Sequence, residues 1–66
     1  MESIEFDKQI YKLDAIKKAI TEFEKLANFS IIDSNEIIKV KINKIDPEVK
    51  DILKDEFANY VLGMQS

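Results

Sequence analysis

The sequence predicts an α+β fold in which two helices cover one face of a three-stranded sheet. Residues 2–7 and 36–43 alternate polar and apolar side chains, as half-buried strands do. Residues 12–27 and 47–62 instead repeat apolar side chains at helical spacing. The chain has 66 residues, which is the size of one small domain. We therefore expect residues 1–66 to form a single domain with the element order β-α-β-β-α.

The first strand and the first helix follow from the pattern of the first 27 residues. Ile4 and Phe6 share one face of an alternating segment, which predicts a half-buried strand at 2–7. Residues 8–11 turn the chain into a helix at 12–27. The apolar side chains of this helix form one broad stripe, which consists of Leu13, Ile16, Ala19, Ile20, Phe23, Leu26 and Ala27.

The middle of the chain predicts a β-hairpin with arms at 28–33 and 36–43. Both arms are rich in β-branched residues, and the polar residues between them are turn formers. The expected core side chains are Phe29, Ile31, Ile38, Val40 and Ile42. Ile32, Ile37 and Ile45 are expected on the opposite, helix-free face. Scattered isoleucines on a surface are ordinary, whereas a cluster of them would form an interaction patch, and both interpretations stay open.

The last third of the chain predicts a capped helix from about 47 to 62. Asp46 suits the N-cap position and Pro47 suits the first helical position. Gly63 is expected just after the end of the helix. Apolar side chains follow at helical spacing, and they are Val49, Ile52, Leu53, Phe57, Tyr60 and Met64.

The order of the elements predicts the topology of the sheet. A right-handed crossover makes the first two strands parallel and leaves a gap that the third strand fills, antiparallel to both. The expected strand order is 1-3-2 with both helices on one face, which is a ferredoxin-like split βαβ motif without its last strand. In the full motif that last strand pairs with the outer edge of the first strand. We expect this edge to be unpaired here.

The composition argues against several classes of function. The chain has no Cys and no His, which removes disulfides, thiolate or imidazole metal sites, and Cys or His nucleophiles. It has ten Lys and 13 acidic residues but no Arg, which disfavours nucleic-acid binding. It has no Gly-rich phosphate loop and no nucleophile elbow. We expect no enzymatic activity and no cofactor. Without a signal sequence or a long apolar stretch, we expect a cytoplasmic protein that does not bind membranes.

Three polar or aromatic residues stand out as candidates for a functional role. Glu56 falls on the apolar stripe of the last helix, beside Ile52, Leu53 and Tyr60. A carboxylate there must find a partner or change its protonation, so it is either a boundary acid or a partner contact. Asn59 lies at the edge of the same stripe and allows the same two roles. Tyr11 lies on the side of the first helix away from its stripe, where it either folds over the sheet edge or anchors an interface.

Several segments resemble the HxsD-like family of small proteins. The resemblance is carried by IEFDKQIY at 4–11, DAIKKA at 14–19 and DEFANYVL at 55–62. It implies an accessory protein of a radical S-adenosylmethionine peptide-maturation system, with the maturase or the precursor peptide as its partner, and not the enzyme itself. The motif positions that it carries over are Tyr11, Lys18, Ala19, Glu56, Phe57 and Asn59.

We therefore expect a non-catalytic adaptor that binds a protein or peptide by strand addition along residues 2–7. Within this segment Ser3, Glu5 and Asp7 face outward and favour a basic or neutral partner. The expected partner-binding residues are Ile4, Glu5, Phe6, Tyr11, Lys18, Glu56 and Asn59. The alternative is a small structural homodimer, because a core of this size stabilises a chain by only about 3–5 kcal/mol. Nucleic-acid binding on the open sheet face is less favoured, since no aromatic side chain is expected there.

Overall fold

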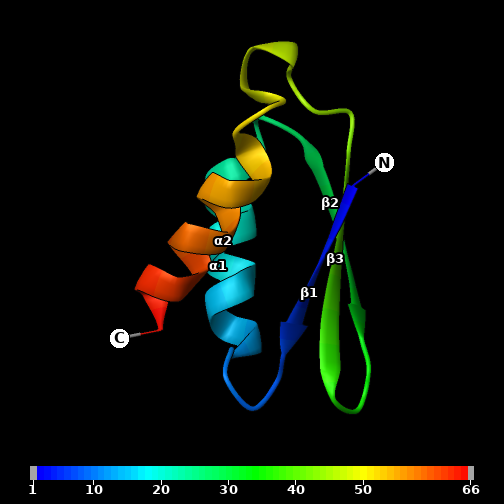
Figure 1. Cartoon of the computed structure of the whole chain (residues 1–66), viewed down its shortest axis with the longest axis vertical. Helices are drawn as coiled ribbons and strands as arrows, with labels where there is room; N and C mark the ends of the chain where they lie inside the picture. Colours follow the sequence, from blue (N-terminus) through cyan, green and yellow to red (C-terminus); the bar gives the residue numbers. More distant parts are fainter. Residues whose placement is uncertain (1, 66) are drawn as a thin grey trace.

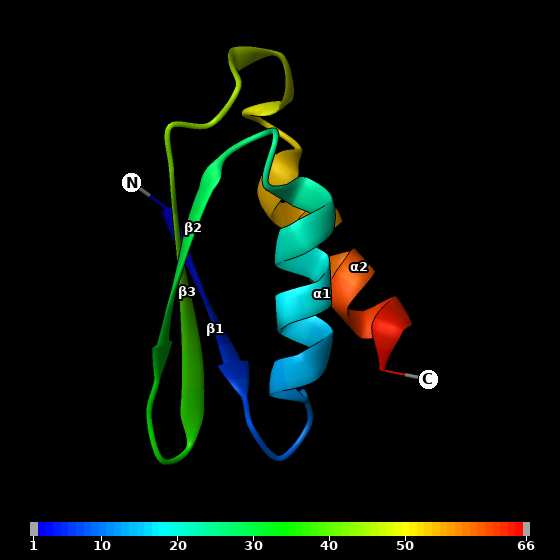
Figure 2. The ribbon, with the colours of Figure 1, turned by 180° about the vertical axis from the view of Figure 1, so that it is seen from behind.

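Three strands and two helices make up the computed structural model, which describes residues 2–65. In chain order the elements are β1 (Glu2–Asp7), α1 (Leu13–Phe23), β2 (Asn28–Asp33), β3 (Ile37–Asn43), a 3-10 turn η1 (Pro47–Val49) and α2 (Leu53–Met64). The sheet forms one layer and both helices form a second layer on one of its faces (Figures 1 and 2). The predicted α+β fold and its element order are confirmed.

Strand β3 is the centre of the sheet and pairs antiparallel with both of its neighbours. The strand order is β1-β3-β2, so β1 and β2 run parallel to each other, as the crossover argument predicts. Ile4 of β1 and Ile31 of β2 both lie opposite Val40 of β3. Because successive residues of a strand point to opposite faces, the buried side chains of Ile38 and Ile42 share the helix-covered face with Val40.

The hydrophobic core is centred on Phe57 of α2, which is fully buried. Its ring stacks on Phe29 of β2 with centroids 5.0 Å apart. The rings of Phe23 and Phe6 contact it edge-on, at 5.6 Å and 6.3 Å. Offset-stacked and edge-to-face aromatic pairs each contribute about 0.5–1.5 kcal/mol beyond the area that they bury. One side chain therefore joins both helices and both outer strands.

Helix α1 ends earlier than the predicted range of 12–27. Its last helical residue is Phe23, and the N–H of Leu26 donates to the carbonyl of Phe23 in a three-residue turn (2.9 Å). The carbonyl of Leu26 accepts from the N–H of Asp46 (2.8 Å), in the connection that follows β3. The helix cannot continue here because the chain must reverse to enter β2, although Leu26 and Ala27 still pack against the core, as their place in the apolar stripe predicts.

The predicted helix at 47–62 is wrong at both of its ends. The carboxylate of Asp46 does cap a helical turn, since its Oδ1 accepts from the N–H of Glu48 (2.9 Å), but that turn is the short η1. Helix α2 starts only after Ile52, where the N–H of Glu56 bonds to the Ile52 carbonyl (3.0 Å). Gly63 lies inside α2 and has no positive φ, so it does not terminate the helix.

The late start of α2 changes which of its side chains reach the core. A 3-10 turn advances the chain by three residues per turn and not 3.6, which shifts the phase of the helix that follows. Ile52 is therefore 54% exposed, although the uniform helical pattern places it in the core. Met64 keeps the face of the buried stripe but is 38% exposed, because it is the last residue of α2. Leu53, Phe57 and Val61 form the buried stripe of α2.

The helix-free face of the sheet carries two of the three isoleucines predicted there. Ile32 and Ile37 are exposed by 43% and 40% and lie diagonally across the β2–β3 pair. The prediction for Ile45 is wrong, because its side chain packs against the core. Lys44 has a left-handed backbone conformation with φ of 51°, and this bend after β3 turns the next residue toward the helices.

Candidate functional site

Strand β1 has one hydrogen-bonding edge that no described segment of the chain occupies. The N–H of Lys8 donates to the carbonyl of Glu36 (3.0 Å), which continues the β1–β3 ladder by one residue pair. In an antiparallel pair, every second residue points its backbone groups at the neighbouring strand. The even-numbered residues of β1 therefore bond to β3, and Ser3, Glu5 and Asp7 direct their N–H and C=O groups outward.

One of these outward groups is already bonded. The carbonyl of Asp7 accepts from the N–H groups of Ile10 and Tyr11, at 3.0 Å and 2.8 Å, in the turn that leads to α1. This turn closes the lower end of the edge, and an Asp7 side-chain oxygen supports it by accepting from the N–H of Gln9 (2.8 Å). The groups left for an added strand are the N–H and C=O of Ser3 and Glu5 and the N–H of Asp7.

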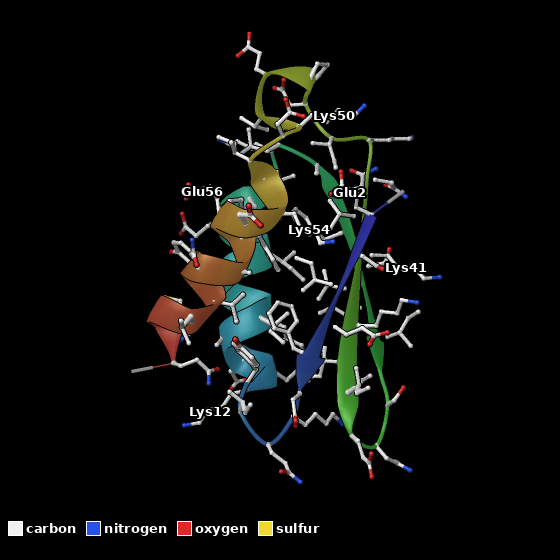
Figure 3. The ribbon with its side chains drawn as sticks, viewed as in Figure 1. Glu2, Lys12, Lys41, Lys50, Lys54 and Glu56 are labelled. Atoms are coloured by element: carbon white, nitrogen blue, oxygen red, sulfur yellow. The ribbon has the colours of Figure 1, made fainter. Side chains whose placement is uncertain are left out.

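Helix α2 covers the face of the sheet at β1, whereas α1 covers it toward β2 (Figures 1 and 2). Tyr60 of α2 packs edge-on against Phe23 of α1 with ring centroids 5.6 Å apart, which fixes the side of α2 that faces α1. Ala58 precedes Tyr60 by two residues, so at about 100° per residue it lies on the other side of the apolar stripe. The half-buried Ala58 and the exposed Lys54, one turn earlier, therefore face the side where β1 has its free edge. In Figure 3 Lys54 extends from α2 toward β1.

A glutamine holds the end of α2 against the turn that follows β1. The Gln65 side-chain carbonyl accepts from the N–H of Lys12 (2.7 Å), and its amide donates to the carbonyl of Ile10. Ile10 and Leu62 are exposed and belong to the two segments that this contact joins, and the backbone N–H of Gln65 donates to the Leu62 carbonyl (3.2 Å). Apolar surface is thus available near the lower end of the free edge.

The helix-free side of β1 is acidic. Glu5 and Asp7 are exposed and lie directly opposite Lys39 and Ile37 of β3. A shallow hollow at the Asp7 end of β1 is lined by both carboxylates and by Glu36 from the β2–β3 turn. Lys8 lines the same hollow, but its ammonium forms an ion pair with Asp33 of β2. Lys39 is a cross-strand cation for Glu5, whereas the residue opposite Asp7 is uncharged.

The predicted binding residues fall into two groups. Ile4, Glu5, Phe6 and Tyr11 come together at β1, but only Glu5 is exposed. Phe6 is 2% exposed and belongs to the core, and Tyr11 packs edge-on against it with centroids 4.9 Å apart. Tyr11 therefore has the structural role that was one of its two predicted interpretations.

The other predicted binding residues lie in the helix layer. Lys18 is exposed on α1, and Glu56 and Asn59 are exposed on α2. The placement of Glu56 on the apolar stripe is wrong, because α2 starts after Ile52 and turns this residue out of the stripe. In Figure 3 Glu56 is on the side of α2 away from the sheet.

The sequence interpretation missed two features of this region. Gln65 carried no signal, because an isolated glutamine near a chain end matches no pattern. The second feature is the outer edge of β2, where the same alternation directs the backbone groups of Phe29, Ile31 and Asp33 outward. The order 1-3-2 already implies this second edge, and it supplies a control for experiments on β1.

Residues 2–65 contain no candidate metal centre. These residues hold no group of three or more carboxylates that could bind a metal ion. Neither helix in this part of the chain has the length and hydrophobicity needed to cross a bilayer. The described part of the chain also has no buried charged side chain. The two free strand edges are therefore the features with a clear capacity to bind something, and the edge of β1 is the one that a fourth strand of the split βαβ motif would occupy.

Comparisons with known proteins give no match: no family model, no curated protein and no solved structure is significantly similar to the chain. The resemblance to the HxsD-like proteins stays a prediction from the residues that carry it.

Proposed function

We propose that this protein is a non-catalytic binding module that holds an extended segment of a partner protein or peptide along the outer edge of β1. The proposal is supported by the row of outward backbone groups at Ser3, Glu5 and Asp7, on the strand that α2 covers. An added strand would give the sheet the fourth strand of the complete split βαβ motif. Strand addition of this kind supplies affinity through backbone hydrogen bonds and specificity through alternate side chains.

The size of the edge limits the affinity that the backbone can provide. Five groups are available, and a hydrogen bond contributes a net stabilisation of roughly 0.5–1.5 kcal/mol. Together these bonds correspond to about 2.5–7.5 kcal/mol before the cost of ordering the partner. Side-chain contacts must therefore contribute to any binding tighter than micromolar, and the exposed acidic side chains of β1 itself can do so.

The family resemblance supports a more specific setting for this module. In that setting the protein is an accessory component of a radical S-adenosylmethionine peptide-maturation system, and the bound segment belongs to the maturase or to the precursor peptide. The resemblance includes 4–11, and therefore most of β1 and its following turn. An accessory role also agrees with a chain that contains no Cys with which to bind an iron–sulfur cluster through thiolates.

The test is a titration of the isotope-labelled chain with a neutral probe, the heptapeptide Thr-Val-Thr-Val-Thr-Val-Thr, followed by amide NMR and hydrogen exchange. We expect the amides of Ser3, Glu5 and Asp7 to shift and to gain protection from exchange. The variant Glu5→Pro should abolish this response, because it removes an outward N–H and places a ring on the edge. Glu5→Gln keeps the N–H and should retain it.

A control variant separates the two edges of the sheet. Asp33→Pro removes an outward N–H at the end of β2 and also the carboxylate that pairs with Lys8, whereas Asp33→Ala removes only the carboxylate. With the neutral probe, both variants should leave the response at β1 unchanged. Binding of the probe that persists in Glu5→Pro, or that moves only the amides of β2, would contradict the proposal.

A second copy of the chain is the alternative occupant of the same edge and would give the predicted homodimer. Pairing two β1 strands through their outward residues places Ser3 or an acidic residue opposite each Glu5. Registers that put Glu5 opposite Glu5 or Asp7 bring like charges together, which is destabilising in a sheet. Sedimentation of the wild-type chain and of Glu5→Pro measures this outcome directly, since a dimer formed through β1 would become a monomer in the variant.

A further inference from the structure

We infer that the free edge of β1 selects a basic segment, with Lys or Arg at the positions of the added strand that lie beside Glu5 and Asp7. This inference rests on the proposed function and adds the chemistry of the partner to it. Residues of an added strand alternate between the two faces of the sheet. Those on the helix-free face would stand next to the exposed carboxylates of Glu5 and Asp7.

The charges around this edge are unequal along its length. Asp7 lies opposite the uncharged Ile37, and Glu36 lines the same hollow. Lys8 follows Asp7 in sequence, so its side chain points to the opposite, helix-covered face and forms its ion pair with Asp33 there. Glu5, by contrast, lies opposite Lys39. The lower end of the edge, at Asp7, is therefore the end that most favours a positively charged side chain.

The opposite face of the added strand meets a different surface. Its side chains would point toward α2, where Ala58 is half-buried and Leu62 is 56% exposed. Lys54 also faces this side, so a basic residue on this face would meet a like charge. The structure therefore favours a segment that alternates basic side chains on the helix-free face with small or apolar side chains below α2.

The same charges argue against the competing occupants. A second copy of the chain brings its own Glu5 and Asp7 to the edge, and an acidic segment likewise places negative charges beside these two residues. Opposite charges on neighbouring strands are favourable and like charges directly opposite are unfavourable, each by amounts that correspond to a change of roughly 1.4- to 5-fold in affinity. Two such positions, compared between a basic and an acidic segment, give an expected ratio of at least about four-fold.

The test compares three heptapeptides that share the same valines and differ only on the other face: Lys-Val-Lys-Val-Lys-Val-Lys, the threonine peptide used above, and Glu-Val-Glu-Val-Glu-Val-Glu. Dissociation constants are taken from the amide shifts of Ser3, Glu5 and Asp7 alone, so that binding of a cationic peptide elsewhere does not count. We expect the Lys peptide to bind tightest and the Glu peptide weakest. The difference should shrink at about 0.5 M NaCl, because exposed charges are screened there.

Charge reversal on the protein gives the reciprocal test. The double variant Glu5→Lys/Asp7→Lys should prefer the Glu peptide, whereas Asp55→Lys, an exposed charge reversal on α2, should keep the original order of affinities. If the double variant does not fold, the peptide series on the unmodified chain still decides the question.

The outcomes distinguish this inference from the proposed function. If the threonine peptide shifts the β1 amides and the Lys peptide binds no tighter, the charge selection is wrong and the strand-addition function stands. If no peptide affects these amides, both are wrong. If the wild-type chain is a dimer that Glu5→Pro dissociates, the occupant of the edge is a second copy and not a basic segment.

Discussion

The side-chain carbonyl of Gln65 accepts a hydrogen bond of 2.7 Å from the backbone N–H of Lys12, which is 53 residues earlier in the sequence. The amide of the same side chain donates to the carbonyl of Ile10. Lys12 is the residue before the first turn of α1, where backbone N–H groups have no partner within the helix. One glutamine side chain therefore accepts from a backbone N–H at the start of α1 and holds the end of α2 against the turn that follows β1.

The first prediction concerns this contact. Gln65→Ala should lower the free energy of unfolding by about 1–2 kcal/mol, because it removes two hydrogen bonds at an exposed site. Chemical denaturation followed by circular dichroism measures the change. Gln9→Ala removes a side chain of the same kind from the neighbouring turn and should change stability by less than about 0.5 kcal/mol. Equal effects of the two substitutions would show that the Gln65 contact contributes nothing.

The second prediction concerns Gly63. Because Gly63 lies inside α2 without a positive φ and a Cβ there would meet no atom within 4 Å, Gly63→Ala should stabilise the protein. The expected gain is about 0.5–1 kcal/mol, which is the usual difference between Ala and Gly in a helix. A helix that ended in a left-handed glycine would instead be destabilised by this substitution. The sign of the change in melting temperature therefore distinguishes the structure from the C-terminal cap that the sequence predicts.

The third prediction concerns the centre of the core. Phe57→Ala should cost about 3–5 kcal/mol, which is the range for truncating a buried aromatic side chain. This is as large as the total stability expected of a core of this size, so the variant should be largely unfolded at 25 °C. Leu62→Ala, at an exposed position of the same helix, should stay folded. Far-ultraviolet circular dichroism of the two variants makes the comparison, and a well-folded Phe57→Ala would contradict this account of the core.

The fourth prediction concerns the alternation of backbone groups along β1. Glu5→Pro should cost little stability, about 1 kcal/mol or less, because its N–H points away from β3 and Pro is tolerated on the open side of an edge strand. Ile4→Pro removes an N–H that bonds to β3 opposite Val40, and should destabilise the protein by about 3 kcal/mol or more. Thermal unfolding of the pair measures the difference. The reverse order would mean that the other set of residues faces outward.

The sequence was sufficient to predict the strands and their pairing. A period of two is a strong signal in β3, where Ile38, Val40 and Ile42 are buried and Lys39 and Lys41 point to the other face. In Figure 3 Lys41 points away from the helices. The helix boundaries were predicted less well, because the stop after Phe23 depends on where the chain must enter β2, and the late start of α2 depends on a 3-10 turn that no local pattern distinguishes from a first helical turn.

Some features of the candidate site could likewise be predicted from the sequence, and others could not. That β1 has a free edge follows from the strand order, and the outward direction of Glu5 and Asp7 follows from their place in the alternation. The sequence could not predict that Glu56 and Ile52 face solvent, because the phase of α2 is set by the turn before it. Nor could it predict that Gln65 joins residues 10 and 12, since this contact spans more than 50 residues.

The sequence by itself determined the kinds of element, their order and the faces of the strands, because these depend on side chains only a few residues apart. It also determined the unpaired edge of β1, because that edge follows from the handedness of one crossover. Only the tertiary structure decided the ends of the helices, the packing of α2 over β1, and the ion pair between Lys8 and Asp33. These features depend on contacts between segments distant in sequence, whose geometry is fixed only when the helices pack on the sheet.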